Sequence, residues 1–206
     1  MKDLLREIKQ SFRLYMNGVT AQSLRDKGLD YHLNWGASLG HLREMACDYE
    51  PSHELAMALW QENVRECKIL ATLLMPHDEM TFDEAWQWIG DTKTQEIAEL
   101  ATMHLYQYLP FSKTLALRLI EEDGEMAQQG QEGMNGEIQQ EEQKDEDGEM
   151  RQLSGYCLMT RLLMKGETLT EEERQRVLSR AETTLQGNGG IGLKRHAGNL
   201  VNGITE

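Results

Sequence analysis

Residues 54–76, ELAMALWQENVRECKILATLLMP, contain the pattern that decides the fold. Trp60, Val64 and Cys67 recur at spacings of three and four residues, which place apolar side chains on one face of a helix. Ser52, just before this stretch, is a residue type that caps helix N-termini, and a proline ends the stretch. The pattern predicts two consecutive apolar helices with Trp60 in the core.

Similar amphipathic stretches fill most of the chain and are separated by short breaks rich in Gly, Pro, Ser and Thr. Long alternations of Val, Ile and Thr, which strands require, are missing. The chain is therefore predicted to be all-α, with roughly ten short helices. Helix pairs over 38–75, 81–121 and 149–186 fit either a compact bundle or stacked pairs, and their length favours a HEAT-like α-α superhelix, or solenoid.

Length and composition limit the class of protein. A chain of 206 residues suits a single helical-repeat domain over 1–206. It contains no apolar run long enough to cross a membrane, and its first residues carry charges throughout, unlike a signal peptide. The three cysteines lie far apart, as reduced thiols do, so we expect a cytoplasmic protein with no membrane partner.

Most of the net charge of −14 is concentrated in one tract. Residues 121–150 contain 12 acidic side chains and one Lys, and the motif EDGEM occurs at 122–126 and again at 146–150. Such a polar, Gly-containing segment cannot bury enough apolar surface to fold by itself. We therefore expect an acidic low-complexity loop insertion over 122–148. The remaining body is close to neutral, which excludes a strongly basic binder but not a modest nucleic-acid groove.

No linear motif for metal, nucleotide or nucleophilic chemistry is complete, so we assign no metal and no cofactor. Around Asp145 the acids alternate as in a calcium loop, but Gly148 comes two positions early. The glycines over 187–192 precede Lys194 and Arg195 without the Gly-Lys-Ser/Thr order and the strand of a phosphate loop. A weak anion site at the N-terminus of the following helix stays open.

Two tryptophans are the candidates for an exposed aromatic side chain. Trp86 and Trp88 are two residues apart, so on a helix they point to different faces and only one needs to be buried. An exposed indole ring can stack on an unpaired base. A contact between two helices is the alternative.

Three stretches resemble the DNA alkylation-repair family of HEAT-like helical-repeat proteins. They are residues 54–76, DEAWQWIGDTKTQEIAELATMHLYQYLPF at 83–111 and MRQLSGYCLMTRLLMKG at 150–166. Trp60, followed by Arg65 and Glu66, matches a Leu-Trp and Arg-Glu pattern before a long apolar helix. The resemblance covers most of the chain outside 122–148 and implies the same stacked-helix fold.

In that family, the alkylpurine DNA glycosylases line a basic concave groove with aromatic side chains. The resemblance implies a Trp and, four residues later, an Asp that stabilises positive charge developing on the sugar. Here the residue four after Trp86 is Gly90, and the residue four after Trp88 is Thr92. Catalysis is therefore predicted to be absent or altered. The weak candidates for a substitute carboxylate are Asp91, Glu96 and Glu99.

The predicted function is a non-catalytic binding scaffold, with a DNA-damage-binding protein or an alkylpurine DNA glycosylase with an altered site as the alternative. Possible partners are duplex DNA, bound weakly, or an unidentified protein. Scattered cations and the tryptophan pair supply the weak DNA-binding candidates, which are Trp86, Trp88, Arg151, Arg161, Lys194 and Arg195. The alternative role of the cations is to balance the Glu-rich segment 167–173 on solvated faces.

Overall fold

A computed structural model describes residues 1–26, 31–121 and 137–205, without the side chains of 137–147. The helices form two compact units, Met1–Thr81 with Tyr108–Pro110, and Phe82–Gln107 with Phe111–Glu206. The first unit contains α1 (Lys2–Ser11), the 3₁₀ turn η1 (Phe12–Tyr15), α2 (Gly18–Asp26), α3 (Leu39–Ala46), α4 (His53–Trp60) and α5 (Arg65–Leu74). The second contains α6 (Phe82–Gly90), α7 (Gln95–His104), α8 (Ser112–Glu121), α9 (Glu137–Met164), α10 (Glu171–Gln186) and α11 (Ile191–Thr205), and the 3₁₀ turn η2 (Tyr106–Tyr108) lies at the boundary.

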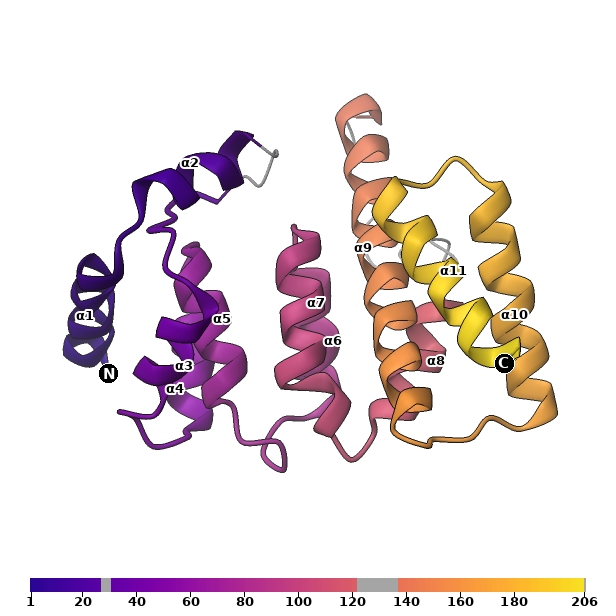
Figure 1. Ribbon diagram of the computed structural model, residues 1–206, viewed down its shortest axis with the longest axis horizontal. Coiled ribbons are helices and arrows are strands. Elements are labelled where there is room, and N and C mark those ends of the chain that lie inside the picture. Colours follow the sequence, from indigo (N-terminus) through magenta and orange to yellow (C-terminus); the bar gives the residue numbers. More distant parts are fainter. Residues whose placement is uncertain (27–30, 122–136, 206) are drawn as a thin grey trace. The chain divides into compact units, whose positions relative to one another are not determined.

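The all-α prediction is confirmed. The described residues contain no strand, only an isolated bridge between Leu33 and Val64. Among consecutive helices, the pairs α4/α5, α8/α9 and α10/α11 make extensive contacts, and α9, α10 and α11 alternate in direction (Figure 1). These pairs are offset from the expected boundaries, because α9 pairs with α8 before it and α10 with α11 after it.

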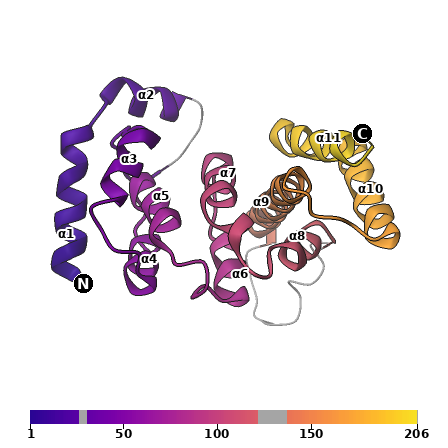
Figure 2. The same cartoon turned by 60° about the horizontal axis from the view of Figure 1, so that its bottom comes forward.

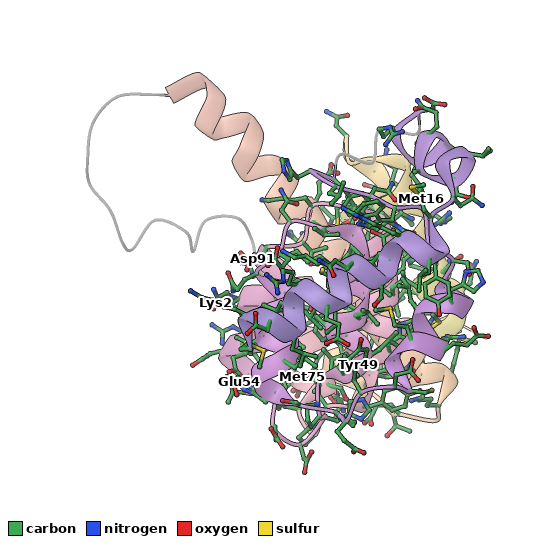
Figure 3. The ribbon with its side chains drawn as sticks, turned by 90° about the vertical axis from the view of Figure 1, so that its left-hand side faces the viewer. Lys2, Met16, Tyr49, Glu54, Met75 and Asp91 are labelled. Carbon is green, nitrogen blue, oxygen red and sulfur yellow. The ribbon has the colours of Figure 1, made fainter. Side chains whose placement is uncertain are left out.

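The first unit is built around the two helices that residues 54–76 predict. The Ser52 hydroxyl accepts a hydrogen bond from the Leu55 amide at 3.3 Å and so caps α4, as expected. Trp60 is completely buried and Cys67 on α5 is also in the core. Figure 3 looks onto α1, with Lys2 at its start and Met16 beyond its end. This helix buries Ile8, and Phe12 of η1 is buried as well.

Two buried, oppositely charged residues in the first turn of α5 form hydrogen bonds to the irregular segment before α3. The Arg65 Nη1 lies 3.2 Å from Glu66 Oε1 and donates a hydrogen bond to the Ala37 carbonyl at 2.9 Å. The Glu66 carboxylate accepts hydrogen bonds from the Trp35 and Ala37 amides. The matching Arg-Glu residues therefore have a structural role, because they fix an irregular backbone whose polar groups would otherwise be buried without partners.

The second unit is organised around α9, which contacts α6, α7, α8 and α11, as the turned view of Figure 2 also shows. This helix begins at Glu137, so 137–148 is helical and not part of a loop. The Glu, Gln and Lys residues of this stretch are good helix formers, and packing of 150–162 against neighbouring helices allows the helix to extend toward its N-terminus. Residues 122–136 of the expected insertion lie outside the described part of the chain.

Candidate functional site

The tryptophan pair on α6 divides as its spacing predicts. Trp88 is only 1% exposed and belongs to the core of the second unit. Trp86 is half-buried and presents part of its ring at the surface. Of the two aromatic candidates, Trp86 is therefore the one accessible to a ligand, because the ring of Trp88 is packed inside the protein.

Two arginines from different helices lie against the Trp86 ring. The guanidinium carbon of Arg118, on α8, is 4.7 Å from the ring centroid, and that of Arg151, on α9, is 4.8 Å away. Phe82, one turn earlier on α6, stacks on Trp86 at 6.0 Å and 14°. We call these four residues the arginine–tryptophan patch. A cation–aromatic contact at an exposed site contributes about 0.5–1 kcal/mol to stability.

Gly90 gives Arg151 its place in this patch. A Cβ atom at Gly90 would lie 2.5 Å from Nη2 of Arg151, closer than non-bonded atoms approach. Arg151 also donates a hydrogen bond from Nη1 to the Trp86 carbonyl at 3.4 Å. At the position four residues after Trp86, the protein therefore has a guanidinium group beside a glycine rather than an aspartate.

Glu99 is the candidate carboxylate with the most polar neighbours. One oxygen, Oε1, lies 2.7 Å from Arg195 Nη2 and 2.9 Å from His196 Nε2, both on α11. Gln95 Nε2 donates a further hydrogen bond to the same oxygen at 2.6 Å. Partial burial acts to raise the pKa of Glu99, but the hydrogen bonds from Gln95 and His196 and the nearby positive charges outweigh it and hold the pKa below its ordinary value. Glu99 is thus an ionised carboxylate engaged in holding α7 to α11.

The other two acidic candidates lie at helix ends. Asp91 is exposed directly after α6, and its amide donates to the Gln87 carbonyl, which continues the helical hydrogen bonding. Glu96 lies in the first turn of α7, where a negative charge stabilises the helix dipole. Glu96 therefore has a local structural reason for its residue type, whereas Asp91 is held only through its backbone.

The cations predicted to bind DNA are separated by the fold. Arg151 joins the arginine–tryptophan patch, whereas Arg195 pairs with Glu99. Arg161 is a hydrogen-bonding partner of Cys157, whose thiol pKa is raised by burial. Lys194 is half-buried on the first turns of α11. Only one of the four thus lies against Trp86.

The N-terminus of α11 already has an anion in place. The Gly190 amide donates a hydrogen bond to Glu149 Oε1, from α9, at 3.0 Å. The dipole of a helix favours a negative charge at this end. The anion site left open for the glycine-rich segment 187–192 is therefore filled by the protein's own carboxylate.

A shallow groove of about 450 Å³ runs along one face of α10. We call it the α10 groove, and it is lined by Glu121, Gln175, Arg176, Ser179, Arg180 and Thr183. The spacing of Arg176 and Arg180 indicates a common helix face from the sequence alone.

The contribution of Arg118 to the arginine–tryptophan patch could not be found from sequence spacing. Its aromatic partner, Trp86, is 32 positions away on another helix.

The described residues contain no group of three or more His, Cys, Asp or Glu side chains that could hold a metal ion. Within the same part of the chain, every helix is too short or too polar to cross a membrane.

The fold is similar to that of a solved structure described as "A new family of proteins related to the HEAT-like repeat DNA glycosylases with affinity for branched DNA structures". The TM-score is 0.73 at 13% sequence identity, over 97% of this chain and 74% of that one. This confirms the HEAT-like helical-repeat fold that the sequence predicts and its likeness to the fold of glycosylase relatives. No family model matches the chain, and no curated protein matches its sequence.

Proposed function

We propose that this chain is a non-catalytic, cytoplasmic DNA-binding scaffold that prefers branched DNA to linear duplex. The observation that carries the proposal is the position of the Arg151 guanidinium, beside Gly90 and against the half-buried Trp86 ring. This position argues against base excision and supports a nucleic-acid surface.

Base excision would require the opposite charge at this position. A glycosidic bond breaks through an oxocarbenium-like state whose positive charge needs a nearby anion. Arg151 supplies a cation there, which would destabilise that state. Glu99 cannot compensate readily, because its carboxylate is already paired with Arg195 and His196.

The same arrangement suits DNA binding. A partly exposed indole ring can stack on an unpaired base, and guanidinium groups pair with phosphates. Branched DNA offers unstacked bases and converging backbones at one point, whereas linear duplex keeps its bases stacked. The affinity for branched DNA stated for the structurally similar family agrees with this expectation. Because few phosphates would be neutralised, the affinity is expected to be modest and to fall only shallowly with salt.

Fluorescence anisotropy of the purified full chain tests the proposal, with a four-way DNA junction and a linear duplex of the same arm sequences at low salt. We expect tighter binding to the junction. Trp86→Ala should weaken junction binding by about 5- to 150-fold, the range for one base–aromatic stack. Arg151→Gln should also weaken junction binding, and Arg6→Gln is its charge control, because Arg6 is exposed and its ion pair with Asp3 is long, at 3.7 Å.

A parallel assay follows release of alkylated purines from methylated DNA. No release is expected. Base excision that Asp91→Asn or Glu96→Gln abolishes would establish the glycosylase alternative. A chain that binds neither DNA at low salt would refute the DNA-binding proposal and favour a scaffold for a protein partner.

A further inference from the structure

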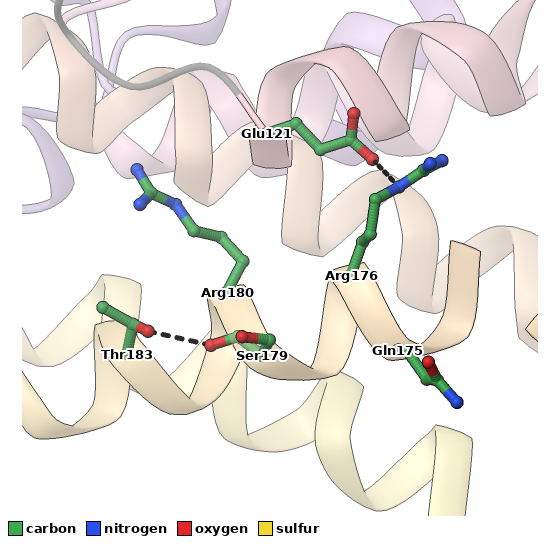
Figure 4. A pocket seen from close by; sticks show the side chains of 6 residues that line it. All are labelled: Glu121, Gln175, Arg176, Ser179, Arg180 and Thr183. Carbon is green, nitrogen blue, oxygen red and sulfur yellow. Dashed lines mark hydrogen bonds and ion pairs between the residues drawn. The ribbon is translucent and has the colours of Figure 1, made fainter. Parts of the chain in front are cut away.

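The α10 groove combines groups that recognise phosphate. Arg176 and Arg180 project from the same face of α10 one turn apart, with Ser179 between them (Figure 4). Guanidinium groups present several N–H donors in a plane that matches the oxygens of a phosphate, and a hydroxyl adds a further donor. The groove is open to solvent and all the residues that line it have polar or charged side chains, so it suits a group that stays attached to a longer chain.

One carboxylate from α8 reaches into this groove. Glu121 Oε1 accepts from Arg176 Nε at 2.9 Å, and the terminal nitrogens of Arg176 lie beyond that bond (Figure 4). The Arg176 side chain is 56% exposed and the Glu121 side chain is 39% exposed. An exposed pair of this kind contributes at most about 1 kcal/mol, so an incoming phosphate can replace the carboxylate at little cost.

The α10 groove adjoins the arginine–tryptophan patch through two helices. On α8, Arg118 contacts Trp86 and Glu121, three residues later, contacts Arg176. On α9, Arg151 contacts Trp86, and the next residue, Gln152, accepts hydrogen bonds from Arg180 once its amide is oriented to satisfy both groups. Neighbouring residues of α8 and α9 thus link the two arginines at Trp86 to the two arginines of the groove, which favours an extended polyanion over a single small anion.

We propose that the α10 groove binds a backbone phosphate of the DNA strand whose base stacks at Trp86. This inference rests on the proposed DNA-binding function and assigns the groove a second, sequence-independent contact. Arg176 and Arg180 bind the phosphate, and Glu121 acts as an internal competitor that holds Arg176 in place when DNA is absent.

The test uses Arg176→Gln with Arg180→Gln, and separately Glu121→Gln, in junction-binding titrations from 50 to 200 mM salt. The double arginine variant should bind about tenfold more weakly and reduce the slope of log affinity against log salt by about 1. Glu121→Gln should change affinity in the opposite direction, because it releases Arg176. If the variants acted by disrupting the fold, both would weaken DNA binding. Opposite changes in affinity therefore distinguish loss of a phosphate contact from loss of structure.

Matched controls lie on the opposite face of the same helix. Glu182→Gln makes the same charge change as Glu121→Gln, and Arg174→Gln removes one of the two charges that the double arginine variant removes, both on α10 outside the groove. If they act as strongly as the groove variants, or if the groove variants leave DNA binding unchanged while the parent chain binds, the groove proposal is wrong.

Inorganic phosphate supplies a second readout that separates this proposal from the proposed function. In amide NMR spectra, phosphate should shift the signals of Ser179 and Thr183, and the double arginine variant should lose those shifts. If phosphate shifts these amide signals but the protein binds no DNA, the groove is an anion site and the proposal that a DNA strand occupies it is refuted. An acidic peptide that shifts the same signals more strongly than the DNA junction would also overturn the proposal.

Discussion

Each unit contains a tryptophan whose ring lies against a cationic side chain. The two rings differ in burial, and this difference decides whether the cation–aromatic contact can serve binding. In the first unit, Lys68 Nζ lies 4.3 Å from the Trp60 ring, which is completely buried. In the second, Arg118 and Arg151 approach the half-buried ring of Trp86. The cation beside the buried ring packs over the core, whereas the cations beside the half-buried ring form a surface that a ligand can use.

The acidic residues differ in the same way. Glu66 is completely buried with Arg65 and fixes an irregular segment of backbone. Glu99 is 36% exposed and links two helices at the surface through Arg195 and His196. Glu66 in the first unit therefore contributes to folding, whereas Glu99 in the second unit lies where solvent can reach it.

The largest expected effect is a difference in stability between variants of the two tryptophans. Trp60→Ala should lower the free energy of unfolding by about 3–5 kcal/mol, because it leaves a cavity in the core. Trp86→Ala should lower it by about 1 kcal/mol, since the ring is already partly solvated. Urea unfolding followed by circular dichroism measures both. Equal losses would contradict the assignment of Trp86 to a functional surface.

The acidic residues give the next largest difference. Glu66→Gln should destabilise the protein by about 3 kcal/mol, because it leaves the buried Arg65 charge uncompensated. Glu99→Gln should cost no more than about 1 kcal/mol, the usual value for an exposed pair. The same urea titration measures both variants. A larger loss from Glu99→Gln than from Glu66→Gln would reverse the comparison.

Gly90→Ala probes the patch without changing any charge. The added methyl group must displace Arg151, so affinity for junction DNA should fall by about two- to fivefold, the loss of one cation–aromatic contact. Stability should stay level or rise slightly, because alanine favours a helix. Gly148→Ala is the matched control, since a Cβ there meets no atom within 4 Å. Equal DNA affinity for both variants and the parent chain would remove Arg151 from the binding surface.

The smallest expected effect is a pH dependence of stability at Glu99. Its folded-state pKa lies below the ordinary value of 4.5, so the ionised form stabilises the fold above that pH. As the pH falls through the lowered pKa, this contribution is lost. The difference in unfolding free energy between the parent chain and Glu99→Gln should therefore shrink from pH 7 to pH 3. A difference that grows on acidification would contradict the ion pair.

Local patterns in the sequence predicted several features correctly. Ser52 caps α4 in the structure, as its residue type and position predicted. The spacing of Trp86 and Trp88 predicted that one would be buried. The start of α9 was missed, because a charged stretch with little apolar surface is stabilised as a helix by the packing of the residues that follow it.

The sequence by itself determined the all-α class, the order of the helices and the absence of an aspartate four residues after Trp86, because these follow from spacing along the chain. Only the tertiary structure decided which charges meet. It placed Arg118 and Arg151 on one indole ring, paired Glu99 with residues of α11, and set Glu149 at the N-terminus of that helix. Such contacts join residues 32 to 97 positions apart, and no local periodicity encodes them.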